Sequence, residues 1–346
     1  MDVFDLVLRY ALDHNASDLH MVDGHVPVLR VDGELQLTET DNPALKDTEL
    51  ILQEIMSVTQ FKEFRDKRHL GFSYGLPGVG RFRLEAFFNL GKMGLAVRLR
   101  AQSLPEVPDL GLPRVVGQLC RKPHGLILVT GPTGVGKTTT LTAMVDLINR
   151  ERSCKIITIE DPVEHVHASK KSLVIQQEVH DDTPSFAIAL RHVLRQDPDV
   201  VVVGEMRDLE TIQTALTAAE TGHLVLTTLH TSTASQTVDR IIDVFPGDQQ
   251  HQVRVQMASC LAGIISQRLL PKITGEGRVL AYEILINTSG SRNLIREGKT
   301  QQLESVMQSS GGIGMCTMQN TIQKLYKDHL ISKEVASIHL EELKDE

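Results

Sequence analysis

The chain has 346 residues, of which 41% are hydrophobic and 4% aromatic, with no tryptophan. This length favours two domains over one, and the hydrophobic fraction is sufficient for buried cores. The formal net charge of −8 makes the chain a poor general binder of polyanions. The scarcity of aromatic side chains also argues against a stacking platform for single-stranded nucleic acid, so we expect no nucleic-acid partner.

The four cysteines are scattered and form no C-x-x-C pair, which argues against both a disulfide framework and a zinc site. No apolar run approaches the ~20 residues of a membrane span. The acidic start, with Asp2 and Asp5, is unlike the basic start of a signal peptide. We therefore expect a cytoplasmic protein that does not insert into a membrane and is at most peripheral to one through a partner.

Residues 1–102 are predicted to form a small α/β domain, because helical periodicity and strand-like alternation both occur there. The helical stretches are residues 4–15 and 48–64, and the alternating stretches are residues 26–37, with a turn at Asp32 and Gly33, and 72–100, with breaks at residues 77–80 and near Gly91. The segment 103–113 contains three prolines and one glycine. It is the best candidate for a linker.

Residues 114–346 are predicted to form a second domain, in which short apolar runs alternate with helical stretches. The predicted strands are residues 126–130, 155–159, 199–203 and 224–229. Near-continuous apolar runs are typical of a parallel sheet that is covered on both faces, and such sheets bind ligands at the carboxyl ends of their strands. From about residue 245 onward the pattern is mostly helical.

A complete G-x-x-x-x-G-K-[ST] phosphate loop follows the first of these strands and precedes a helical stretch, which is the context that the motif requires. Its glycines allow the backbone N–H groups to approach phosphate oxygens. Lys137 is placed to reach the β- and γ-phosphates, and the Thr138 hydroxyl to hold Mg²⁺. The expected nucleotide-binding residues are Gly131, Pro132, Thr133, Gly134, Val135, Gly136, Lys137, Thr138 and Thr139.

Carboxylates also follow two further predicted strands. Glu160, Asp161 and Glu164 lie around Pro162, and beside a triphosphate such groups are useful when they touch Mg²⁺ or a water molecule. The alternative is an acidic turn at a strand end, which is common, and the neighbouring phosphate loop is what favours a functional role. Glu205 follows the Val200–Val203 run, with Gly204 where many ATPases have an Asp. Glu205 is the strongest candidate to activate the attacking water.

Two histidines bracket the last predicted strand of this set, His223 before it and His230 after it. Their separation of seven residues predicts opposite faces of a straight strand, so they cannot share one role. We expect one of them to sense the γ-phosphate. A zinc pair is a poorer alternative, because no third ligand lies at a suitable spacing.

Arginines of the first domain form a stripe, Arg81, Arg83, Arg98 and Arg100. Arg81 and Arg83 are two residues apart and share a strand face. A neighbouring subunit could use this stripe to supply an arginine finger in trans. The alternative is a solvated basic edge strand that discourages aggregation.

With these motifs in this order, the chain resembles the secretion-superfamily ATPases over its whole length, and among them the retraction motors of type IV pili. Gly204 in place of Asp is typical of that family. The segment 291–297 is similar to a C-terminal motif that is associated with retraction. Three positions depart from the family pattern. Val135 replaces a common Ser at a loop position expected to face solvent, His124 stands before the first strand where an Arg is expected, and Glu85 follows the arginine pair where a neutral residue is usual.

The resemblance implies a homohexameric ring of subunits with a PAS-like N-terminal domain and a RecA-like ATPase domain, the latter ending in C-terminal helices. ATP and Mg²⁺ are the implied cofactors. Hydrolysis would drive an inner-membrane platform protein at the base of the pilus, giving pilus retraction and twitching motility. A paralogous retraction ATPase is a further implied partner.

The resemblance also implies roles for individual residues. Thr138 and Glu160 would hold Mg²⁺, partly through water. Glu205 would be the catalytic base, and Glu164 would serve the metal or water site with Glu160. The remaining implied nucleotide contacts are His223, His230, Arg81, Arg83 and Arg98.

Four alternatives remain open from the sequence. An accessory retraction-type paralogue would keep the same motifs. An assembly or secretion ATPase usually has an extra N-terminal domain and a tetracysteine zinc module, and neither is evident here. A nucleotide switch without useful hydrolysis is disfavoured by Lys137, Glu205 and His230. A nucleic-acid translocase is disfavoured by the acidic balance.

Overall fold

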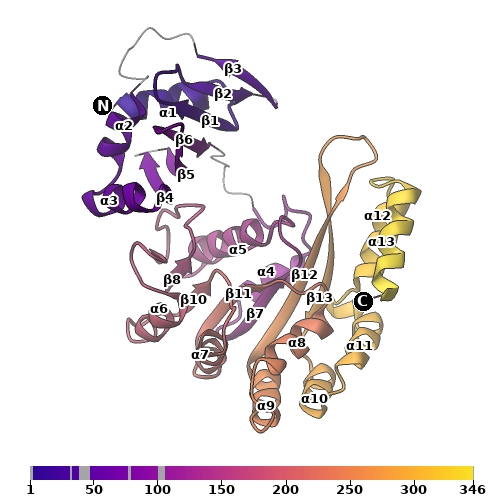
Figure 1. The fold of residues 1–346 in the computed structure, drawn as a ribbon. Helices are drawn as coiled ribbons and strands as arrows, with labels where there is room; N and C mark the ends of the chain where they lie inside the picture. The colour runs from indigo at the N-terminus through magenta and orange to yellow at the C-terminus, as the bar shows by residue number, and fades with distance from the viewer. Residues whose placement is uncertain (1–2, 32, 39–46, 77–78, 100–105, 346) are drawn as a thin grey trace. The chain divides into compact units, whose positions relative to one another are not determined.

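The computed structural model describes residues 3–31, 33–38, 47–76, 79–99 and 106–345. The chain folds into two compact units (Figure 1): residues 1–103 with the short segment 162–166, and residues 104–161 with 167–346. Several predicted features lie outside the described residues, namely Asp32 of the first turn, residues 77–78 of the second break, Arg100, and residues 103–105 of the linker.

The first unit contains a six-stranded antiparallel sheet of order β3-β2-β1-β6-β5-β4. The strands are β1 (Asp18–Val22), β2 (Val28–Val31), β3 (Glu34–Leu37), β4 (His69–Leu76), β5 (Gly80–Asn89) and β6 (Lys92–Arg98), and the helices are α1 (Val3–Asp13), α2 (Thr48–Ile55) and α3 (Val58–Lys67). On β5, Phe82 and Leu84 are buried in the core, with Phe4 of α1 and Phe64 of α3. The alternate residues of β5 therefore lie on the other face of the sheet.

The helical prediction for residues 48–64 is confirmed except at residues 56 and 57, where the stretch is divided into the two helices α2 and α3. Met56, which ends α2, is in an extended conformation. Ser57 then caps α3: its hydroxyl accepts from the N–H of Gln60, and the Gln60 side chain accepts from the N–H of Ser57. This reciprocal capping box starts a new helix within an otherwise helical pattern.

The second unit contains a seven-stranded sheet of order β13-β12-β7-β11-β10-β8-β9. Neighbouring strands are parallel except for the antiparallel pair β12 and β13. The strands are β7 (Gly125–Thr130), β8 (Lys155–Glu160), β9 (Leu173–Glu178), β10 (Val200–Val203), β11 (Leu224–Leu229), β12 (Leu261–Pro271) and β13 (Arg278–Ile286). The four strands predicted for this region are confirmed, and β9 is an additional strand at the edge of the sheet.

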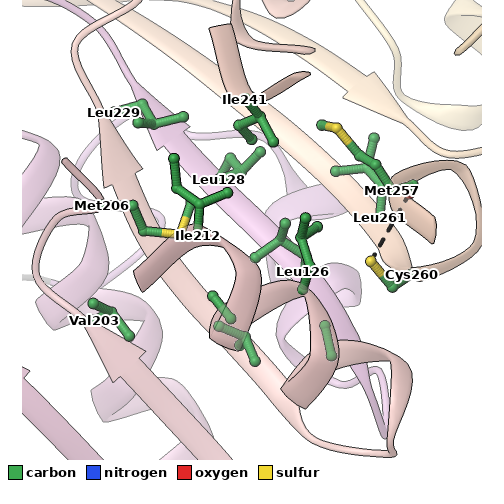
Figure 2. Packing of buried hydrophobic residues seen from close by; sticks show 14 of the residues in the cluster. Leu126, Leu128, Val203, Met206, Ile212, Leu229, Ile241, Met257, Cys260 and Leu261 are labelled. Atoms are coloured by element: carbon green, nitrogen blue, oxygen red, sulfur yellow. Dashed lines mark hydrogen bonds between the residues drawn. The ribbon is translucent and has the colours of Figure 1, made fainter. Parts of the chain in front are cut away.

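Alternate residues of these strands enter two separate cores, one on each face of the sheet. Ile127 and Val129 of β7 pack in the core that includes the helices α4 (Arg114–Cys120) and α5 (Lys137–Glu151). Leu126 and Leu128 pack in the opposite core, among Ile212, Ile241 and Met257 (Figure 2). The helices of that core include α6 (Phe186–Val193), α7 (Leu209–Glu220), α8 (Ala234–Asp243) and α9 (Gln250–Cys260). This three-layer arrangement confirms the predicted α/β class with a parallel sheet.

The prediction of a mostly helical chain after residue 245 is wrong for residues 261–286. They form the long hairpin of β12 and β13, which extends the sheet beside β7. The first eight residues of β12 are all buried, so the strand lacks the alternation that identifies half-exposed strands. The helices that follow are α10 (Ser289–Glu297), α11 (Leu303–Ser309), α12 (Met318–Lys327) and α13 (Lys333–Asp345). Over the described part of the chain, no helix is both long and apolar enough to span a bilayer.

Candidate functional site

The phosphate loop connects β7 directly to α5, which begins at Lys137. Gly131, Gly134 and Gly136 have φ values of +140°, +81° and +88°, which side chains rarely adopt. Gly131 is also confined: a Cβ there would lie 2.4 Å from the carbonyl oxygen of Gln267 on β12. The loop is therefore seated closely on β12, and only glycine fits at that contact.

The ammonium group of Lys137 lies within the loop. Its Nζ donates to the carbonyl oxygens of Gly131 at 2.7 Å and Pro132 at 2.9 Å, and it lies 3.4 Å from Nδ1 of His230. The residue is only 8% exposed. Burial lowers the pKa of Lys137 below its ordinary value, against the opposing charge of Glu205. A bound phosphate would supply the negative charge that this cation favours.

Glu205 follows β10 at the same edge of the sheet, and its side chain is 17% exposed. Its Oε2 lies 3.5 Å from Nε2 of His230, and its Oε1 lies 2.6 Å from Nη2 of Arg207. His230 thus lies between Lys137 and Glu205, so residues from three strand ends form one polar cluster. Arg207 belongs to this cluster although the sequence reasoning assigned it no role; its position two residues after Glu205 was the available signal.

Glu160 of β8 lies beside Gly204, because Val203 of β10 is in register with Ile159. Glu160, Gly204 and Thr138 all line a cavity of about 40 Å³ between α5 and the strands β8 and β10. A cavity of this size is large enough for a water molecule or a small ion. Since Gly204 has no side chain, Glu160 supplies the carboxylate of the cavity from the neighbouring strand.

The donors around this cavity fit Mg²⁺. Mg²⁺ prefers oxygen ligands and is usually bound by one or two carboxylates together with water and substrate phosphates. The Thr138 hydroxyl and the Glu160 carboxylate provide such oxygens. Over the residues that the structure describes, no group of three or more His, Cys, Asp or Glu side chains forms a self-sufficient metal site. The metal would therefore depend on the nucleotide for its remaining ligands.

His223 is not close to the phosphate loop of its own unit, contrary to its predicted place among the nucleotide-binding residues. It precedes β11 at the amino edge of the sheet, where its carbonyl accepts from the N–H of Gly125. Its Nδ1 lies 3.0 Å from the carbonyl oxygen of Ala218. The two histidines lie at opposite ends of one strand, and strand length separates them by roughly 20 Å.

Val135 is buried, which corrects the expectation of a solvent-side loop position. Its Cγ2 would lie 2.9 Å from a Cβ at Gly131, so its side chain packs onto the loop backbone. By contrast, Pro132, Thr133 and Gly134 are exposed, and Thr138 and Thr139 are half-buried in the first turn of α5.

The remaining predicted residues belong to the first unit. Glu164 is exposed, in the segment 162–166. Arg83 of β5 lies directly opposite Arg98 of β6. Arg83 pairs with Glu85 at 3.5 Å, and Arg98 pairs with Asp18 at 3.7 Å. The arginine stripe is thus partly neutralised by carboxylates on the same sheet.

Two residues of β12 support the phosphate loop and were missed by the sequence reasoning. Ser266 Oγ lies 2.9 Å from Oγ1 of Thr130, the last residue of β7. Nε2 of Gln267 donates to Oγ1 of Thr140 in α5 at 2.7 Å. Because β12 was predicted to be helical, no local pattern indicated that these residues would meet the loop.

The family model described as "Type II/IV secretion system protein" matches residues 2–338. The chain belongs to this family. It is 46% identical to the type IV pilus retraction ATPase PilT of Pseudomonas aeruginosa over 97% of each chain. It is 36% identical to the type IV pilus ATPase PilU of the same organism, over 99% of this chain and 90% of PilU.

Solved structures agree with this assignment. A crystal structure of the pilus retraction motor PilT with bound ADP has a TM-score of 0.88 and 50% identity, covering 97% of this chain and 96% of that one. The ATPase DotB of Legionella pneumophila has a TM-score of 0.76 and 27% identity, covering 97% and 95%. The predicted family and enzyme class are confirmed: the chain is a nucleotide-binding ATPase with a RecA-like domain.

Proposed function

We propose that this ATPase is the motor of type IV pilus retraction, working as a homohexamer that drives an inner-membrane platform protein at the base of the pilus. The observation that carries the proposal is the contact of Lys137, His230 and Glu205 at the carboxyl edge of β7, β11 and β10. This cluster combines a phosphate-binding cation, a γ-phosphate sensor and a base, which hydrolysis requires.

The relatives support retraction rather than another mechanical task. Both the curated PilT and the solved PilT structure are named for retraction, and both match nearly the whole chain. Identity to PilT, at 46%, exceeds identity to the type IV pilus ATPase PilU, at 36%, so the relative that is named for retraction is the more similar of the two.

In the proposed reaction, Lys137 exchanges its loop carbonyls for the β- and γ-phosphates of ATP. Glu205 accepts a proton from the attacking water while a bond forms between that water oxygen and the γ-phosphorus. The bond from the γ-phosphorus to the bridging oxygen breaks, and ADP and phosphate are released. His230, already beside Lys137 and Glu205, contacts the γ-phosphate and links its presence to the position of the base.

Thr138 and Glu160 would hold Mg²⁺, Glu160 partly through water, and the ion would offset the negative charge that develops on the phosphate oxygens. Arg81, Arg83 and Arg98 are proposed to add positive charge from the first unit, of the same or a neighbouring subunit. Glu164 is proposed to serve the same metal or water site. The cycle of closure, hydrolysis and release would then move the two units against each other.

The experiment that tests this function is imaging of labelled pili in the source organism after deletion of the gene. Abundant pili that extend but no longer shorten support a retraction motor. A cell without pili would overturn the proposal in favour of an assembly ATPase. Unchanged pilus length and dynamics would also overturn it, in favour of an accessory paralogue or another secretion system.

A further inference from the structure

The carboxylate of Glu160 is held by two neighbouring side chains. Its Oε1 accepts from Oγ1 of Thr158 at 2.6 Å and from Nε2 of Gln176 at 3.0 Å. Thr158 belongs to β8, whereas Gln176 belongs to β9, the edge strand of the sheet. Because both donors bind the same oxygen from two different strands, they fix the direction in which the carboxylate points.

The orientation of the Gln176 amide is itself determined. Its Oε1 accepts from the backbone N–H of His167 at 2.7 Å. A backbone N–H can only donate, so the amide oxygen must face His167 and the NH₂ group must face Glu160. Thr158 and Gln176 are direct neighbours in the parallel pairing of β8 and β9, which places both donors beside the carboxylate.

The Glu160 carboxylate held in this way belongs to a residue that lines the same cavity as Thr138. Thr158 and His167 line this same cavity, so the hydrogen bonds that hold Glu160 lie at one side of the proposed metal position. Partners of metal-binding carboxylates orient the ligand, and their removal commonly weakens metal affinity or activity by ~10-fold or more. A glutamate on a strand end has several rotamers, and hydrogen bonds from a rigid sheet select one of them.

We propose that Gln176 is a positioning residue which, together with Thr158, aligns Glu160 for the metal–nucleotide complex. The edge strand β9 thereby becomes part of the ATPase machinery. This inference rests on one part of the proposed function, namely that Glu160 helps to hold the Mg²⁺ that accompanies the nucleotide. A purely structural role for Gln176, joining β9 to β8, would change stability without changing metal dependence.

The experiment compares full-length Gln176→Met and Thr158→Val with the wild type and with Gln177→Met. Gln177 is the adjacent residue of β9 and belongs to the opposite strand face, so it is a matched control. Calorimetry measures ADP binding with Mg²⁺ and with EDTA, and electron paramagnetic resonance measures Mn²⁺ bound in the presence of ADP. Thermal unfolding verifies that each variant is folded.

We expect Gln176→Met and Thr158→Val to bind ADP normally in EDTA. The gain in affinity from Mg²⁺, and the Mn²⁺ affinity of the ADP complex, should fall by ~10-fold in both. Gln177→Met should retain wild-type values. If Gln176→Met does not fold, the nearly isosteric Thr158→Val tests the same hydrogen-bonded carboxylate, and wild-type metal dependence in that folded variant would overturn the proposal.

Glu160→Gln separates the failure of this inference from the failure of the proposed function. If Glu160→Gln loses the Mg²⁺ effect while Gln176→Met keeps it, Gln176 does not position Glu160, but the proposed ATPase site stands. If Glu160→Gln keeps the gain in ADP affinity from Mg²⁺, Glu160 does not serve the metal. The proposal that Gln176 positions Glu160 for the metal is then overturned. If the wild type shows no Mg²⁺-dependent nucleotide binding, the proposed function itself fails.

Discussion

At the scale of single residues, the environment of Lys137 gives the site a dependence on pH. Burial lowers its pKa, so the free protein begins to lose this proton below the ordinary lysine value of 10.5. At neutral pH, Lys137 is charged in both the folded and the unfolded state, so burying its charge lowers the free energy of unfolding by the full amount. That cost is relieved as the pH rises from the folded pKa to the unfolded one.

Nucleotide affinity should change in the opposite direction to folding stability: as the pH rises, stability increases and affinity decreases. A bound phosphate favours the charged lysine, so ADP affinity should fall as pH rises through the lowered pKa of Lys137. Calorimetric titration of ADP from neutral pH up to the ordinary lysine pKa of 10.5 measures this, with thermal unfolding as a control for the fold. Constant affinity across that range would contradict the environment that the structure gives to Lys137.

The second residue-scale prediction concerns Glu205. Glu205→Gln preserves the side-chain shape and its proximity to His230, but removes the basic carboxylate. We expect ATP to bind within a few-fold of the wild type, while steady-state hydrolysis falls by ~100-fold or more. Phosphate release and equilibrium ATP binding provide the two measurements. Near-normal turnover would show that Glu205 is not the base.

At the scale of elements, the phosphate loop packs against β12 at Gly131 but not at Gly134, so substitution of these two glycines should have different effects. A Cβ at Gly131 would lie 2.4 Å from a backbone oxygen, whereas a Cβ at Gly134 would meet nothing within 4 Å. Both have positive φ, so each alanine variant carries roughly 1 kcal/mol or more of backbone strain. Gly131→Ala must in addition displace the loop or β12.

We therefore expect Gly131→Ala to lower the melting temperature more than Gly134→Ala, and to abolish ADP binding. Gly134→Ala should lower stability by about 1–2 kcal/mol and keep measurable binding. Thermal unfolding and ADP calorimetry on both variants test this difference. Equal effects would mean that contact with Gln267 does not constrain the loop.

The elements that the sequence predicts correctly are those whose signal is local. Strand, glycine loop and helix follow one another from β7 to α5, and Glu205 and His230 directly follow strands β10 and β11. The misplaced elements depend on contacts far apart in sequence. β12 is buried on both faces and therefore shows no alternation, and β9 is a short edge strand. His223 was predicted to contact the nucleotide, but it lies at the amino end of β11, away from the phosphate loop of its own unit.

At the scale of the whole molecule, each unit has its own hydrophobic core. One core cluster lies wholly within the first unit, and the other clusters lie wholly within the second. Phe64 is fully buried in the core of the first unit, and Ile241 is fully buried in a core of the second unit. A unit with its own core has the interactions needed for a separate unfolding transition.

We expect scanning calorimetry to resolve two transitions. Phe64→Ala should lower one of them by an amount that corresponds to about 3–5 kcal/mol, and Ile241→Ala should lower the other by about 2–5 kcal/mol. A single transition that responds equally to both variants would show that the two units unfold as one.

The absence of a side chain at Gly204 also restricts how this sequence can change over generations. Gly204→Asp would bring a second carboxylate to the small cavity that Glu160 already lines. Two carboxylates that share one small cavity repel each other. Loss of Glu160 alone would leave the cavity without a carboxylate from either position. Exchange of the carboxylate between these two strands therefore requires both substitutions together, so positions 160 and 204 should be inherited as a pair.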